Sequence, residues 1–148
     1  MLSRLLGRLL RPEGPTWYRE LHRYKYQSLI EVRYETGWAL SESVTSSHGW
    51  VHLGAGGLLT IQRGYCWDGP SGPTFDTHNS LRASIIHDAL YQLMRERLLS
   101  LGYRRPADRI LRVVAIEDGM WGWRAKLWER TVNRYAESSA LPPGGDAK

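Results

Sequence analysis

The side chains best suited to chemistry lie in the segment ASIIHDALYQLM, where two polar residues interrupt an apolar run. A histidine among apolar neighbours on one helical face is expected to be partly buried, and Asp88 lies on the shoulder of that face. Burying an unpaired carboxylate is costly, so Asp88 needs a cation, strong donors or water. The face that His87 shares in a helix comprises Ala83, Leu90, Tyr91, Met94 and Leu98.

A second carboxylate is placed to meet this histidine. Asp108, in the segment RRPADRIL, lies in the first turn of the next expected helix and shares a face with the small Ala115. The connection over residues 100–105 is short, which favours antiparallel packing of the two helices. Asp108 can then contact His87 and Tyr91, and a carboxylate on one imidazole nitrogen leaves the other as a base. The alternative interpretation is that His87 and Asp88 form a structural polar pair.

A Gly/Pro-rich loop with the sequence GYCWDGPSGP, residues 64–73, precedes this helix. Such a loop can turn its backbone carbonyls toward a hard cation, and Asp88 can complete the oxygen shell. The alternative is a tight connection from a strand to the helix. The loop therefore indicates either a cation site or a turn.

The segment before this loop is predicted to be extended, since residues 17–67 carry strand signals punctuated by glycines. Apolar and polar side chains alternate over residues 28–35, which predicts a strand. Residues 58–65 predict another short strand. We therefore expect a short antiparallel sheet in the N-terminal half.

Three helices are expected after the loop, so the fold class is α+β. The first covers residues 79–100 with Asn79 or Ser80 as its cap, and Gly102 ends it. The second covers residues 106–118 and stops at Gly119. The third covers residues 121–136 and packs against the other two. Its apolar stripe comprises Trp121, Ala125, Trp128, Val132 and Tyr135.

We expect one α+β domain, over residues 17–136. Residues 1–11, MLSRLLGRLLR, place leucines on one stripe and arginines on the other. This pattern predicts an amphipathic helix that docks on the body or another subunit, or lies on a membrane surface. Residues 12–16 are interpreted as a hinge, and residues 137–148 as a disordered tail.

Composition restricts the class of protein. The 148 residues, 42% hydrophobic and 24% charged, fit a globular domain. No stretch approaches the ~20 apolar residues of a spanning helix. The single Cys66 excludes an internal disulfide and fits a reducing cytoplasm. Seven Trp and eight Tyr against one Phe favour interfaces. The net charge of +5 is concentrated in residues 1–25, which can face nucleic acid, anionic lipid or water.

Taken together, these motifs resemble a known pattern. The stretch GYCWDGPSGPTFDTHNSLRASIIHDALYQLMR, followed by RRPADRIL, resembles an uncharacterised family common in bacteriophages and prophages. The resemblance covers about residues 58–136. The pattern is in turn similar to the phospholipase A2 core, particularly the disulfide-free version in parvovirus capsid proteins, in which a calcium loop precedes a His-Asp helix and an Ala-Asp helix follows.

This resemblance implies roles for four side chains. His87 matches the general base, Asp108 the aspartate that orients it, Tyr91 the supporting tyrosine and Asp88 the calcium carboxylate. The implied reaction is calcium-dependent hydrolysis of a phospholipid ester. In it His87 deprotonates a water, Asp108 stabilises the imidazolium, and calcium polarises the carbonyl.

The resemblance also implies calcium ligands in the loop, where the match is looser because the loop lengths differ. The carbonyls of Tyr65, Trp67 and Gly69 match the positions of calcium ligands. The loop also carries Asp68 and Pro70 where the enzyme family prefers glycines, and Asp68 can itself be a ligand. An anionic phospholipid surface is the partner that this interpretation implies.

Other interpretations stay open. The strongest is a non-enzymatic bacteriophage virion, tail or host-interaction protein that uses the fold as a scaffold, with phage structural proteins or further copies of itself as partners. Such a protein would be located in the virion or in the host cytoplasm. A form that binds lipid would be located peripherally at the membrane. A zinc hydrolase acting on the cell wall would use Asp76, His78, His87 and Asp88, but no paired-histidine zinc motif is present. Nucleic-acid binding is not expected, because only the charge favours it.

Overall fold

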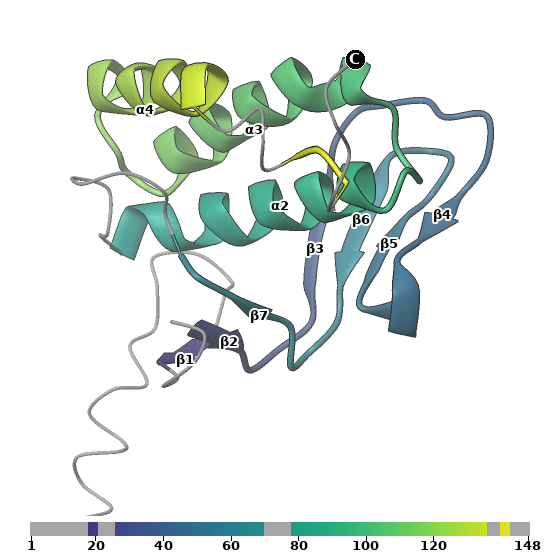
Figure 1. Ribbon diagram of the computed structural model, residues 1–148. Coiled ribbons are helices and arrows are strands. Elements are labelled where there is room, and N and C mark those ends of the chain that lie inside the picture. The colour runs from purple at the N-terminus through teal and green to yellow at the C-terminus, as the bar shows by residue number, and fades with distance from the viewer. Residues whose placement is uncertain (1–17, 21–25, 70–77, 136–139, 143–148) are drawn as a thin grey trace, which may run out of the picture.

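The computed structural model describes residues 18–20, 26–69, 78–135 and 140–142, and two antiparallel sheets precede three helices in it (Figure 1). The α+β class is therefore confirmed. One sheet has the strand order β1-β2-β7 and the other the order β3-β6-β5-β4. The strands are β1 Tyr18–Glu20, β2 Tyr26–Ser28, β3 Val32–Glu35, β4 Val44–Thr45, β5 Val51–Leu53, β6 Leu58–Ile61 and β7 Cys66–Trp67.

The strand expected over residues 28–35 is divided between the two sheets. β2 ends at Ser28, whose hydroxyl donates to the Ile30 carbonyl at 2.6 Å, and β3 begins at Val32. The second expected strand, over residues 58–65, ends at Ile61, because the chain then turns through Gly64 at a φ of 95°. Sequence alternation located these strands but not the turns that separate the sheets.

Helix α2, His78–Arg95, is the central element of the molecule. In Figure 1 it lies between the strands on one side and α3, Arg104–Glu117, with α4, Gly122–Tyr135, on the other. Side chains on nearly every side of α2 are buried, including the polar Ser84 and His87, because strands cover one side of this helix and helices the other (Figure 1). One continuous core contains residues from the strands and from all three helices. Two short 3₁₀ turns are η1, Ser47–Gly49, and η2, Leu101–Tyr103.

The ends of α2 differ from the prediction. The helix begins at His78, so neither Asn79 nor Ser80 is its cap, and it ends at Arg95, well before Gly102. Beyond the last turn the Leu98 amide donates to the Leu93 carbonyl at 2.9 Å. This bond closes a Schellman motif in which Arg97, at a φ of 61°, takes the left-handed position that glycine usually fills.

The end of α3 has the same motif with the expected residue. The Met120 amide donates to the Ala115 carbonyl at 2.9 Å, and Gly119 occupies the left-handed position at a φ of 94°. The prediction that Gly119 stops this helix is confirmed. The start of α3 lies at Arg104, two residues before Pro106, because η2 leads directly into it.

The expected apolar stripe of α4 is right at three positions and wrong at one. Ala125, Trp128 and Val132 are buried, but Trp121 is 72% exposed because it lies in the connection before the helix. Leu98, expected on the buried face of α2, is also exposed, since the helix has already ended. The side chain of Tyr135 lies outside the described residues.

The expected terminal segments are described only in part. The predicted N-terminal helix, 1–11, and hinge, 12–16, lie outside the described residues. Within the predicted tail, 137–148, residues 140–142 are described and Ala140 is fully buried, so this part packs on the domain. Among the described residues, no helix has both the length and the apolar character needed to cross a bilayer.

Candidate functional site

The candidate site lies in the antiparallel seam between α2 and α3. The Nε2 atom of His87 lies 2.6 Å from Oδ1 of Asp108, and the Tyr91 hydroxyl donates to the same oxygen at 2.6 Å. The predicted meeting of these three side chains across the seam is confirmed. His87 and Tyr91 are one helical turn apart on α2, and their ring centroids lie 4.1 Å apart.

The site is deeply buried. Asp108 has no exposed surface, and only 5% of His87 is exposed. Because an ionised carboxylate only accepts hydrogen bonds, the Nε2 of His87 carries the donated proton and Nδ1 keeps its lone pair when the ring is neutral. The second oxygen of Asp108, Oδ2, has no hydrogen-bond partner among the described residues.

The free ring nitrogen of His87 faces its sequence neighbour. Its Nδ1 atom lies 4.0 Å from Oδ1 of Asp88, too far for a direct hydrogen bond. The Asp88 side chain is 31% exposed, so the Nδ1 side of the imidazole is the side nearer to solvent. This is the position at which a group needing a base would have to approach.

Charges around the site decide its protonation. Burial by itself lowers the pKa of His87, but the hydrogen bond and charge of Asp108, with a further contribution from Asp88, outweigh it and raise that pKa above 6.5. Burial, together with the hydrogen bond to Asp108, raises the pKa of Tyr91 well above its usual range. Tyr91 therefore remains a neutral donor, and the carboxylates favour the protonated form of His87.

The residues expected to form a calcium loop are largely tied into the sheet. The carbonyl of Tyr65 accepts a hydrogen bond from the Ser28 amide at 2.9 Å, and Trp67 belongs to β7, which pairs with β2. The Trp67 indole donates to the Ser84 hydroxyl at 2.9 Å, which fastens this strand to α2. Hydrogen bonds to β2 thus hold both Tyr65 and Trp67 in the sheet.

The other two expected loop ligands differ in exposure. The side chain of Asp68 is exposed, whereas Gly69 is buried against Tyr26 at a φ of 83°. A Cβ atom at Gly69 would lie 2.5 Å from the Tyr26 ring, so only glycine fits there. Gly69 is thus explained by packing, without a ligand.

The side chains of the described residues bear on whether the chain holds a calcium or zinc site. No group of three or more His, Cys, Asp or Glu side chains that could hold a metal occurs among them. Asp76 and the side chain of His78, named for the zinc alternative, lie outside the described residues, as do residues 70–77 of the loop. The chemistry that the described part of the site can supply therefore comes from the imidazole and the carboxylates.

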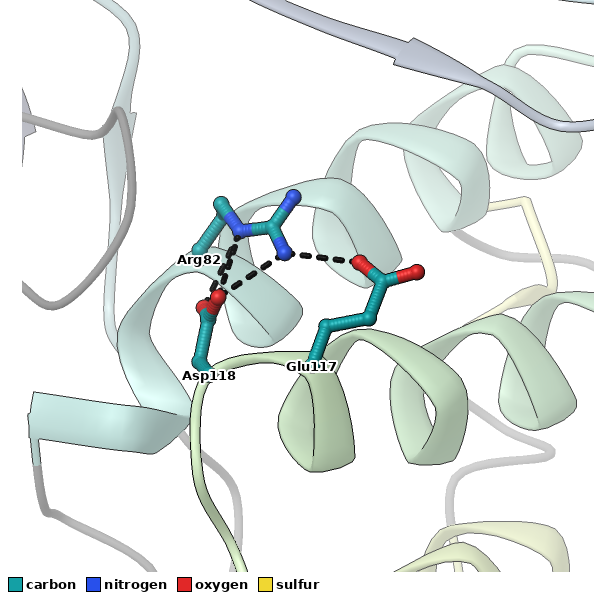
Figure 2. Close-up of polar contacts among 3 residues, drawn as sticks. All are labelled: Arg82, Glu117 and Asp118. Atoms are coloured by element: carbon teal, nitrogen blue, oxygen red, sulfur yellow. Dashed lines mark hydrogen bonds and ion pairs between the residues drawn. The ribbon is translucent and has the colours of Figure 1, made fainter.

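Sequence reasoning missed a second polar cluster on the same seam. Figure 2 shows the Arg82 guanidinium between the carboxylates of Asp118 and Glu117. Its Nε donates to both oxygens of Asp118 at 3.0 Å, and its Nη2 donates to Glu117 at 2.8 Å. An arginine inside the most apolar helix was the available signal, because such a cation needs a carboxylate partner.

Known proteins provide no independent test of the resemblance. No family model, curated protein or solved structure matches this chain. The similarity to the phage family and to phospholipase A2 therefore stays an expectation from the motifs, and the function has to be inferred from the geometry around His87.

Proposed function

We propose that this protein is a hydrolase in which His87 acts as a general base on water and the substrate is a phospholipid ester. The observation that carries the proposal is Asp108, fully buried, with one oxygen 2.6 Å from both His87 Nε2 and the Tyr91 hydroxyl. This arrangement holds the imidazole in one tautomer with Nδ1 available as the base.

The proposed reaction needs no covalent intermediate. Nδ1 of His87 removes a proton from water, and the resulting hydroxide attacks the ester carbonyl carbon. The imidazolium, stabilised by Asp108, then returns its proton to the alcohol oxygen as the carbon–oxygen bond breaks. The products are a fatty acid and a lysophospholipid, so the proton balance on His87 closes after each turnover.

The substrate class rests on the motif resemblance and on the excess of basic and aromatic side chains. Calcium, which the resemblance implies, has no step in this scheme, because residues 70–77 of the expected calcium loop lie outside the described residues. A peripheral place at an anionic bacterial membrane fits this function.

The test is fatty-acid release from vesicles of phosphatidylcholine and phosphatidylglycerol, with added calcium and with a chelator. We expect release by the full chain and a loss of about 10³-fold or more in His87→Gln. The matched control is His52→Gln, a histidine of β5 that bonds to Thr45. Release that survives in His87→Gln, or no release under either condition, would overturn the proposal.

A non-enzymatic phage assembly role is the second candidate, and the burial of His87 favours it. With only 5% of the residue exposed, a substrate has little surface to approach. This role predicts that the protein co-purifies with virions and that His87→Gln changes folding stability but no reaction.

A further inference from the structure

Exposed apolar side chains are concentrated in one stretch of the sequence, which covers the end of α3 and the start of α4. Of the nine large apolar side chains that are exposed in the described residues, five lie within residues 113–127. Trp121 and Trp123 are 72% and 65% exposed, and their ring centroids lie 6.2 Å apart. We call these five residues the tryptophan patch: Val113, Ile116, Trp121, Trp123 and Leu127.

The patch continues along the outer face of α4. Ala125, Trp128 and Val132 point into the core, so the residues on the opposite side of the helix face outward. The exposed outer face comprises Trp123, Lys126, Leu127, Arg130 and Arg134. Tryptophan, leucine and cations are thus combined on one face, with no neutral polar residue among them.

The acidic side chains nearby are already engaged. Residues 104–135 contain eight basic and four acidic side chains. Asp108 binds His87 inside the seam, Glu117 and Asp118 bind Arg82, and Glu129 binds Arg112 at 2.8 Å. Within the described part of the chain, no carboxylate pairs with Lys126 or Arg130. The outer face of α4 therefore keeps a positive charge.

We propose that the tryptophan patch and the outer face of α4 form a docking surface for an anionic lipid bilayer. Indole rings favour the boundary between headgroups and acyl chains, where the ring is apolar and its N–H remains hydrated. Lys126 and Arg130 extend from the same face toward lipid phosphates. This surface lies on α3 and α4 and does not depend on the chemistry proposed for His87.

Charge and composition favour lipid over a protein partner. Protein interfaces are enriched in tryptophan and arginine but depleted in lysine, so Lys126 is the residue on this face that they least often contain. The outer face of α4 combines Trp123 and Leu127 with Lys126 and Arg130, residue types that membrane-surface helices also carry. An anionic bilayer complements both components at once.

The experiment is sedimentation of the full chain with vesicles of phosphatidylcholine, with and without phosphatidylglycerol. We expect binding only to the anionic vesicles, and a loss of about tenfold or more in the double variant Trp121→Ala/Trp123→Ala. Lys126→Gln and Arg130→Gln should each weaken binding about fivefold. The matched controls are Trp50→Ala and Arg63→Gln, which lie outside the patch and should bind as the unchanged protein does.

Three outcomes would overturn the proposal. They are absence of binding to anionic vesicles, equal binding to neutral vesicles, and full binding by the double tryptophan variant. Sedimentation velocity of the same variants identifies a protein interface instead, if the double variant converts an oligomer to a monomer while vesicles remain unbound.

Discussion

Two polar clusters join α2 to α3 at different points of the same seam, and they differ in how completely their charges are satisfied. At one end Arg82 donates to both oxygens of Asp118 and also to Glu117. In the middle, Asp108 accepts two bonds on Oδ1, while Oδ2 has no partner among the described residues. A saturated cluster with a permanent cation stabilises a seam, whereas a partly satisfied cluster around a titratable ring is suited to chemistry.

The largest expected effect tests the central cluster through its carboxylate. Asp108→Asn keeps the shape but no longer fixes the tautomer of His87, so fatty-acid release should fall about 10⁴-fold. The free energy of unfolding should fall by only about 1 kcal/mol. The measurements are initial rates of fatty-acid release and urea unfolding, made on the same preparation of the variant and of the unchanged protein. Tyr91→Phe, which keeps the His87–Asp108 pair, is the control and should lose far less activity.

The second effect tests the Arg82 cluster through stability. Asp118→Ala leaves a guanidinium whose side chain is 11% exposed, with Glu117 as its remaining carboxylate partner among the described residues, so the free energy of unfolding should fall by about 3 kcal/mol. Glu117→Gln should cost about 0.5 kcal/mol, because the Glu117 side chain is 48% exposed and solvent screens its charge. Equal losses in the two variants, measured by urea unfolding, would contradict the assigned difference.

The third effect distinguishes the two clusters by how the free energy of unfolding depends on pH. The pKa of His87 is raised in the folded protein, so its protonated form stabilises the fold fully below pH 6.5. The free energy of unfolding should then decline as pH rises above 6.5 and through the folded pKa. His87→Gln should remove this decline, whereas Asp118→Ala should leave it intact, since Arg82 stays charged. Urea midpoints across roughly pH 6 to 9 would show whether the slope belongs to His87.

The smallest effect comes from two residues outside both clusters, Arg97 and Gly119, whose substitutions serve as controls for stability. Arg97→Gly should raise the free energy of unfolding by about 1 kcal/mol, because Arg97 holds a φ of 61° that suits glycine. Gly119→Ala, at a φ of 94°, should lower it by a similar amount. Neither change should alter fatty-acid release by more than about twofold. A large loss of activity in either variant would show that the assay reports folding rather than the His87 site.

Much of the central cluster was predictable because helix periodicity is local. The spacing of His87 and Tyr91 places both on one face of α2, and a short connection makes α3 antiparallel, which brings Asp108 to them. The Arg82 cluster was missed because its partners, Glu117 and Asp118, lie 35 and 36 positions away. No local pattern reports which residue at the end of α3 faces which residue at the start of α2.

The sequence by itself determined the α+β class, the three helices and the face that carries His87, since periodicity and glycine positions act over a few neighbouring residues. Only the tertiary structure decided that hydrogen bonds tie Tyr65 and Trp67 to β2 and that α2 ends at Arg95. It also decided that Trp121 and Trp123 face outward. These features depend on contacts between segments that are distant in the sequence. The free energy of such contacts cannot be read from the local preferences of either segment.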